Sequence, residues 1–274
     1  KHNVYGGGEM GTIREDANIT IEDGIICRDV YGGGYGSDDY ETHTPITVTG
    51  YAQTDYTFTP MQWAGLVGGD TYVDISGGQV KKSVYGGGEM ASVGVINYTN
   101  AVKNDNADNG FVLSWPYKVE YIPYLDGKPV GGATHVNVTG GRIGAKKNVD
   151  PEFDTDNGDV YGAGKGIAGD YNDYVFCANV RTTDVTINVN SDGVTPKNFE
   201  EGGNCIAGAV YGVGENGHVM EDTKLTITNG LIGHSIYGGG SGKGTFSKKL
   251  LKIGKAANST NEDDYYTRDI YSTS

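Results

Sequence analysis

The chain contains no stretch that approaches 18 consecutive apolar residues, so the sequence predicts no membrane-spanning helix. Positive charge is also scarce. Lys and Arg number 21 against 35 Asp and Glu, which gives a net charge of −14. Nucleic acid and anionic membrane surfaces are therefore poor partners for this protein.

Catalytic motifs are missing as well. The 5 histidines show neither H-x-x-x-H nor H-E-x-x-H spacing, and no nucleophile motif is present, so we assign no catalytic residue. None of the three cysteines, Cys27, Cys177 and Cys205, lies in a C-x-x-C, and an odd number cannot all pair within one chain. We expect small buried side chains at these positions, with a Cys177–Cys205 bridge as the alternative.

Glycine, in contrast, is abundant, at 46 of 274 residues, and much of it belongs to one repeated motif. At this density an interior helix would lose about 1 kcal/mol per glycine, and no Gly-X-Y period indicates collagen. A recurring motif of this kind is the sequence signature of a solenoid. Val-Tyr-Gly or Ile-Tyr-Gly begins at Val4, Val30, Val84, Val160, Val210 and Ile236.

A second motif, an apolar-polar-apolar triplet, alternates with the first. Its spacing to the neighbouring Val-Tyr-Gly motifs gives a unit of 26 or 27 residues, as in the stretch from Ile19 to Ile46. Short alternating segments rich in Val, Ile and Thr and bounded by glycine are typical of half-buried strands. The triplets begin at Ile19, Ile46, Val73, Val136, Val185, Leu225 and Leu251.

Strands separated by glycine corners, repeated every 26 residues, predict an all-β parallel β-helix. Each coil would lie about 4.8 Å from the next and would stack its aliphatic side chains inside. We expect seven to nine coils in a single domain over residues 1–274, with insertions at about 95–132, 144–159 and 190–209. Because the chain starts in mid-repeat, we also expect it to be an excerpt of a longer protein with adjacent domains.

The pattern T-x-V-x-I-x-G-G-x-I followed by V-Y-G-G-G resembles the glycine-rich, right-handed β-helix repeats of bacterial cell-surface and secreted proteins, many of them called adhesin-like. The resemblance implies a right-handed helix, a surface or extracellular location, and contact with glycans or with host and cell-surface proteins. It supplies no catalytic residues. The same fold also occurs in polysaccharide lyases and hydrolases, so the fold alone does not choose between these functions.

The motif residues predict which face of each strand is buried. Strand alternation places the Val or Ile of each motif inside and the following tyrosine on the outer surface. The tyrosines would then either stack on sugar rings or stabilise one another along the stack, and we favour the second interpretation. The middle residues of the triplets, such as Thr20, Asp74 and Asn137, should form a solvated polar row, and His135 should point outward.

Function on a solenoid is expected where the repeat is interrupted. Residues 111–130 alternate and contain Asp126-Gly127, which predicts a hairpin. Its aromatic residues would form either a carbohydrate-binding platform or a packing surface. The candidate ligand-binding residues are Trp115, Tyr117, Tyr121, Tyr124 and Trp63.

The insertions at 144–159 and 190–209 should leave the same corner of two successive coils and lie side by side. The first is rich in carboxylates, which favour a hard cation such as calcium, but it lacks EF-hand spacing, so a solvated acidic loop is the alternative. We expect no other cofactor. The candidate calcium ligands are Asp150, Asp154, Asp156 and Asp159.

Together these features predict a non-catalytic, surface-exposed or secreted β-helix scaffold for adhesion or glycan contact. The alternative is a polysaccharide lyase or a glycoside hydrolase. A hydrolase would need two carboxylates about 5 to 10 Å apart, and a lyase that acts on an acidic polysaccharide would need cations, or bridging calcium, against the charge of its substrate.

Overall fold

The computed structural model describes residues 2–37, 46–49, 55–58, 60–103, 111–121, 124–125, 128–145, 158–167, 177–190, 203–242, 250–255 and 265–269. Side chains are described outside the segments 46–49, 55–58, 60–61, 96–103, 111–121, 124–125, 128–129, 250–255 and 265–269. The fold is nearly all β, with one short helix, α1 (Pro60–Trp63).

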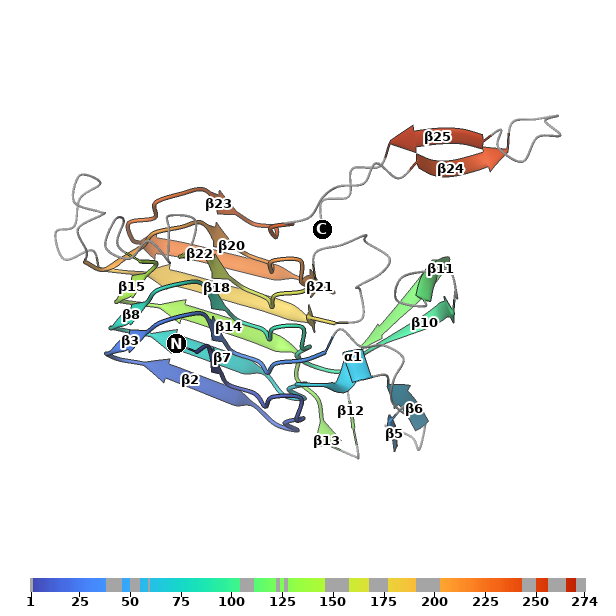
Figure 1. The fold of residues 1–274 in the computed structure, drawn as a ribbon, viewed down its shortest axis with the longest axis horizontal. Helices are drawn as coiled ribbons and strands as arrows, with labels where there is room; N and C mark the ends of the chain where they lie inside the picture. The colour runs from blue at the N-terminus through green and yellow to red at the C-terminus, as the bar shows by residue number, and fades with distance from the viewer. Residues whose placement is uncertain are drawn as a thin grey trace.

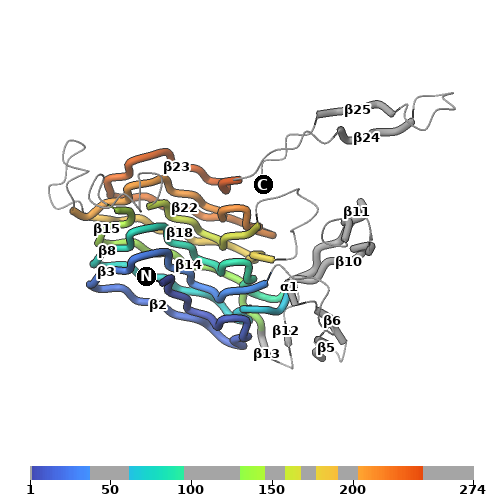
Figure 2. The backbone as a smooth tube through the Cα atoms, viewed as in Figure 1, coloured from blue at the N-terminus to red at the C-terminus, as the bar shows by residue number. Residues whose placement is uncertain are grey.

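Three parallel sheets run side by side along the molecule (Figures 1 and 2), and successive repeats of the chain add strands to each sheet in order. The six-stranded sheet contains the Val-Tyr segments β1 (Val4–Tyr5), β4 (Val30–Tyr31), β9 (Val84–Tyr85), β16 (Val160–Tyr161), β20 (Val210–Tyr211) and β23 (Ile236–Tyr237). The five-stranded sheet contains β2 (Ala17–Ile21), β7 (Thr71–Ile75), β14 (Ala133–Val138), β18 (Thr182–Asn188) and β22 (Thr223–Asn229). The four-stranded sheet contains β3 (Ile25–Ile26), β8 (Gln79–Val80), β15 (Arg142–Ile143) and β19 (Cys205–Ile206). A further parallel pair joins β17 (Asn179–Val180) to β21 (His218–Val219).

The aliphatic core lies between these sheets because equivalent residues of successive repeats pair in register. Val30 lies opposite Val84, and Val73 lies opposite Val136, so each β-branched side chain packs on the same residue type one strand away. The valines at positions 30, 84, 160 and 210 are fully buried, as the sequence predicts. Ile236, in the last strand of its sheet, is 51% exposed and departs from that prediction.

A row of threonine hydroxyls ties the five-stranded sheet to the glycine corner after each Val-Tyr. The hydroxyls of Thr71, Thr134 and Thr183 donate to the carbonyl oxygens of Gly86, Gly162 and Gly212, each at 2.6 Å. All three threonines are buried, so these bonds satisfy carbonyls that water does not reach. The triplet pattern did not reveal this row, because its residues lie just before each triplet.

Two of the seven triplets were assigned wrongly. β5 (Ile46–Thr49) pairs antiparallel with β6 (Asp55–Phe58), and β24 (Leu250–Lys255) pairs antiparallel with β25 (Tyr265–Asp269). Neither joins the five-stranded sheet, so the longest described sheet has 6 strands and not the seven to nine coils expected. A third hairpin joins β10 (Ile96–Lys103) to β11 (Phe111–Tyr121), and a short one joins β12 (Tyr124–Leu125) to β13 (Lys128–Pro129).

The two long loops also differ from the prediction that they share a corner. The loop that includes residues 146–157 connects β15 to β16, whereas the loop that includes 191–202 connects β18 to β19. The first loop therefore follows a strand of the four-stranded sheet, whereas the second loop precedes a strand of that sheet. The motif spacing shows which repeat carries each insertion. It does not show which two strands the insertion connects.

Candidate functional site

The tyrosines of the six-stranded sheet form a continuous stack. Consecutive ring centroids lie 4.7 to 5.1 Å apart, and consecutive ring planes are within 10° of parallel. We call Tyr5, Tyr31, Tyr85, Tyr161, Tyr211 and Tyr237 the tyrosine stack. Tyr31, Tyr85 and Tyr161 are at most 2% exposed, so the prediction that these tyrosines lie on the outer surface is wrong.

A second row of side chains explains this burial. The residue five positions after each motif Val or Ile bridges to its equivalent in the next repeat, which gives the flanking row Glu9, Tyr35, Glu89, Lys165, Glu215 and Ser241. The Tyr5 hydroxyl donates to Glu89, and the Tyr85 hydroxyl donates to Glu215. Alternation therefore placed the rings correctly on the face opposite the valines, but the flanking row closes over that face.

The surroundings of the hydroxyls suppress their ionisation. Burial raises the pKa of Tyr31, Tyr85 and Tyr161, and nearby carboxylates raise it further: Asp29 for Tyr31, Glu215 for Tyr85 and Asp159 for Tyr161. The buried rings have both faces covered by their neighbours and no open surface. The central part of the tyrosine stack is therefore a packing element and not a sugar platform.

In contrast to the buried tyrosine stack, the outer face of the five-stranded sheet is accessible to solvent. Two rows of polar side chains cross it, with neighbours about 4.8 Å apart as the parallel register requires. The first row consists of Asn18, Tyr72, His135, Asp184 and Lys224, and the second of Thr20, Asp74, Asn137, Thr186 and Thr226. The second row is the predicted solvated row without Thr47, which lies in β5.

Side chains on this face pair along the rows. The rings of Tyr72 and His135 stack with centroids 4.7 Å apart and planes within 6°. Asn137 Nδ2 donates to Asp74 Oδ1 at 3.0 Å, and Lys224 Nζ donates to Asp184 Oδ2 at 2.8 Å. His135 points outward, as predicted.

The stacked pair determines what kind of contact this face can make. Because the rings of Tyr72 and His135 cover one another, a ligand that lies across the sheet meets their edges and polar atoms. The face therefore offers hydrogen-bonding groups, namely a hydroxyl, an imidazole, an amide and carboxylates, and not a hydrophobic platform. We call Tyr72, Asp74, His135, Asn137 and Asp184 the polar face.

The predicted aromatic site lies mostly on the third hairpin. Trp115, Tyr117 and Tyr121 are on β11 and Tyr124 is on β12, whereas Trp63 ends α1. The hairpin register shifts between Thr99, opposite Lys118, and Ala101, opposite Leu113. Residues 114–117, which include Trp115 and Tyr117, therefore have no partner in the register and form an irregular bulge in β11. Bulges of this kind frequently redirect side chains at binding sites.

The predicted calcium ligands Asp150, Asp154 and Asp156 lie outside the described residues. Asp159 is described and is 9% exposed. Its Oδ1 accepts the backbone N–H of Ala209 at 2.7 Å, and its Oδ2 accepts the Tyr161 hydroxyl at 3.0 Å. This carboxylate thus holds two strands of the six-stranded sheet together. Among the side chains that the structure describes, no three His, Cys, Asp or Glu form a metal-binding group.

None of the three cysteines forms a disulfide, so the alternative of a Cys177–Cys205 bridge is not what the structure shows. Cys177 and Cys205 are fully buried, as expected, whereas Cys27 is half-buried. Arg142, itself 5% exposed, donates from Nη1 to Cys205 Sγ at 2.9 Å and from Nη2 to the carbonyl oxygen of Ala145 at 3.2 Å. Burial raises the pKa of the Cys205 thiol, and Arg142 opposes that shift. No motif in the sequence marks Arg142 and Cys205 as a buried pair.

No family model, curated protein or solved structure matches the chain. Within the described residues, no helix is long and apolar enough to cross a membrane.

Proposed function

We propose that the protein is a right-handed parallel β-helix that serves as a non-catalytic scaffold for glycan contact on the surface of a bacterium or in a secreted protein. The closed helix is supported by strands that return to three parallel sheets in chain order and with constant register. Such stacking is typical of solenoids, in which each repeat contacts only its neighbours.

The polar face is the observation that carries the proposed contact. It spans adjacent strands, its side chains are half-exposed, and it presents hydrogen-bonding groups at intervals of one strand spacing. Sugar hydroxyls both donate and accept hydrogen bonds, so carboxylate, amide and imidazole groups in one plane suit a saccharide that lies across several strands.

A glycan array, run with and without calcium, tests this proposal. We expect a glycan that binds the wild-type protein to bind His135→Ala and Asn137→Ala about tenfold more weakly, a loss of about 1.4 kcal/mol. Thr228→Ala, at the far end of the same sheet, is the matched control and should bind normally. Equal binding by all three variants would remove the polar face from the site.

The bulge in β11 provides a second contact surface, and Trp115→Ala tests it in the same array. A Trp115 ring that stacks on a sugar should contribute about 1 to 3 kcal/mol to binding. Unchanged affinity in folded Trp115→Ala would leave the hairpin without a role in the contact.

A polysaccharide-cleaving enzyme is the second candidate, because the polar face places Asp74 and Asp184 on strands that flank β14. Asp184 Oδ1 has no hydrogen-bond partner among the described residues. Release of reducing ends or of unsaturated sugars from a bound polysaccharide, lost in Asp74→Asn and Asp184→Asn, would favour the enzyme over the scaffold.

A further inference from the structure

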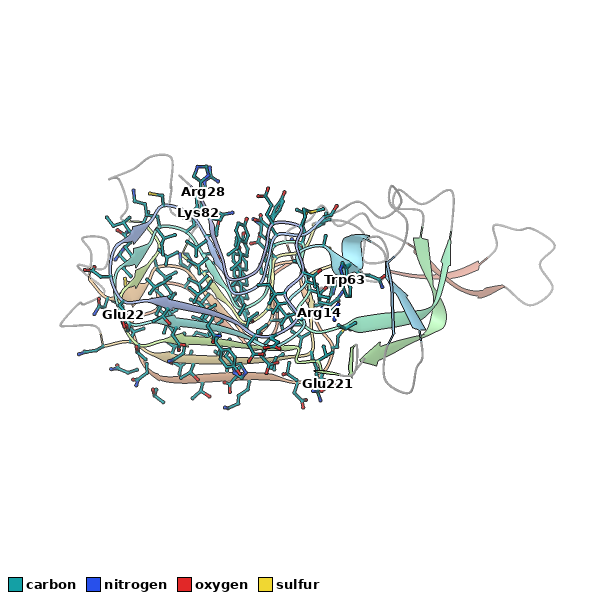
Figure 3. The ribbon with its side chains drawn as sticks, turned by 90° about the horizontal axis from the view of Figure 1, so that it is seen from below. Arg14, Glu22, Arg28, Trp63, Lys82 and Glu221 are labelled. Carbon is teal, nitrogen blue, oxygen red and sulfur yellow. The ribbon has the colours of Figure 1, made fainter. Side chains whose placement is uncertain are left out.

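A short row of basic side chains lies at the corner between the four-stranded and six-stranded sheets. β3 pairs in register with β8, and β4 with β9, so the connecting residues Cys27–Asp29 run beside Lys81–Ser83. Arg28 therefore lies beside Lys82, about 4.8 Å away along the stack. His2 holds the same position before β1 and is exposed. We call His2, Arg28 and Lys82 the basic row. Figure 3 shows Arg28 and Lys82 together, on the side of the strand stack away from Glu221.

This arrangement is unfavourable for the folded protein by itself. Like charges on directly opposite residues of neighbouring strands repel each other. Among the described residues, Arg28 makes no hydrogen bond or ion pair, and the carboxylate near Lys82 is that of Asp29. Asp29 is 8% exposed and its Oδ1 accepts the backbone N–H of Ser83 at 3.0 Å, so it lies beneath the row. Adjacent, half-exposed cations on a chain of net charge −14 thus remain available to an external anion.

We propose that the basic row binds an acidic polysaccharide through its carboxylate or sulfate groups, an inference that rests on the proposed glycan contact and names its ligand class. The Arg28 guanidinium can hold a carboxylate or sulfate with two parallel N–H donors, and Lys82 adds a second charge one strand away. The row follows the stack axis, so a chain with charges at intervals can meet successive strands.

Nucleic acid fits the same surface less well. Duplex DNA carries one charge per about 1.7 Å and gains affinity from many cation contacts, whereas this row offers two fixed charges and a histidine. The excess of carboxylates elsewhere repels a dense polyanion within a Debye length of about 8 Å. A polysaccharide with one charge per sugar has a lower charge density than duplex DNA and meets less of that repulsion.

Calorimetric titration with polygalacturonate, dextran sulfate and neutral dextran tests the proposal. We expect polygalacturonate or dextran sulfate, but not neutral dextran, to bind with an affinity that falls as salt rises. Arg28→Gln and Lys82→Gln should each weaken binding by about tenfold or more, while Arg28→Lys retains part of it. Lys224→Gln removes the same charge from the last strand of the five-stranded sheet, outside the residues of the polar face, and should leave binding unchanged. Preference for dextran sulfate would support the row and identify sulfate as the bound group.

The same titrations separate this proposal from the general one. Equal losses in Arg28→Gln and Lys224→Gln, or tighter binding of single-stranded DNA than of polygalacturonate, would overturn the basic row as a polysaccharide site. Binding of neutral glycans that depends on His135, with no binding of either acidic polymer, would also overturn it but leave the glycan-contact proposal intact. Urea unfolding confirms that each variant is folded, and Arg28→Gln should be no less stable than wild type.

Discussion

Lys165 occupies the position in the flanking row where the Tyr31 hydroxyl would need an acceptor. Each bonded pair of this type joins a tyrosine to a flanking residue two repeats further on: Tyr5 to Glu89, and Tyr85 to Glu215. The same offset assigns Lys165 to Tyr31, but an ammonium group only donates, and Lys165 Nζ lies 3.7 Å from Glu89 Oε1. The Tyr31 hydroxyl thus lacks the carboxylate acceptor that Tyr5 and Tyr85 have, and among the described residues it neither donates nor accepts a hydrogen bond.

Two matched substitutions test this explanation. Tyr31→Phe removes a buried, unsatisfied hydroxyl and keeps the stacked ring, so it should leave the free energy of unfolding unchanged or raise it by up to about 1 kcal/mol. Tyr85→Phe breaks a charge-assisted bond to a carboxylate that is 8% exposed and should cost about 1 to 3 kcal/mol. Urea denaturation measures both. Equal destabilisation would mean that the Tyr31 hydroxyl has a partner in solution.

At the scale of the strand and its corner, the residue after Val-Tyr must be glycine where the backbone of the next repeat leaves no room for a Cβ. A Cβ on Gly86 would overlap the carbonyl oxygen of Gly162, which accepts the Thr134 hydroxyl. Gly238 has the same place in the last strand of the sheet, and a Cβ there meets no atom within 4 Å.

We therefore expect Gly86→Ala to destabilise the fold by more than about 2 kcal/mol, because backbone must move in two repeats. Gly238→Ala should be tolerated to within about 0.5 kcal/mol, since neither glycine has a positive φ. Thermal and urea unfolding of the two variants provide the comparison. A similar cost at both positions would show that conformational freedom, and not the close contact, selects glycine.

The sequence predicts strands correctly where apolar-polar alternation reflects which side chains are buried. It fails where the position of a strand depends on which other strand it pairs with. Alternation correctly identified the buried residues of β2, β7 and β14. The triplets at Ile46 and Leu251 alternate equally well, yet each pairs with the strand that follows it in a hairpin. Only the choice of partner strand distinguishes these cases: the next strand in sequence in the hairpins, and the equivalent strand of another repeat in the five-stranded sheet.

The candidate sites show the same limit. His135 was predicted to be exposed, but its stacking on Tyr72 follows from pairing between residues 63 positions apart. The basic row likewise depends on register, since Arg28 and Lys82 belong to repeats separated by a long insertion. Trp115, by contrast, is a candidate from the sequence alone, because aromatic residues are concentrated around it. The structure shows in addition that Trp115 lies in the bulge of β11.

At the scale of the whole molecule, the tyrosine stack couples stability to alkaline pH. Tyr31, Tyr85 and Tyr161 have a pKa raised above the unfolded value of about 10, because burial and carboxylates disfavour the phenolate. Above that pH the unfolded chain loses these protons while the folded protein keeps them. Their contribution to stability is thus fully present below pH 10 and is lost as the pH rises towards the folded values.

Each such tyrosine should lower the free energy of unfolding by about 1.4 kcal/mol per pH unit above pH 10, so the three together give a steep alkaline transition. Urea unfolding at pH 8 to 11 measures the slope, and phenolate absorbance shows which tyrosines titrate before unfolding. Other groups titrate in this range, so Tyr31→Phe is the control: removal of one buried phenol should reduce the slope by about 1.4 kcal/mol per pH unit. An identical slope in wild type and Tyr31→Phe would mean that Tyr31 ionises within the folded protein, which a closed stack beneath the flanking row does not allow.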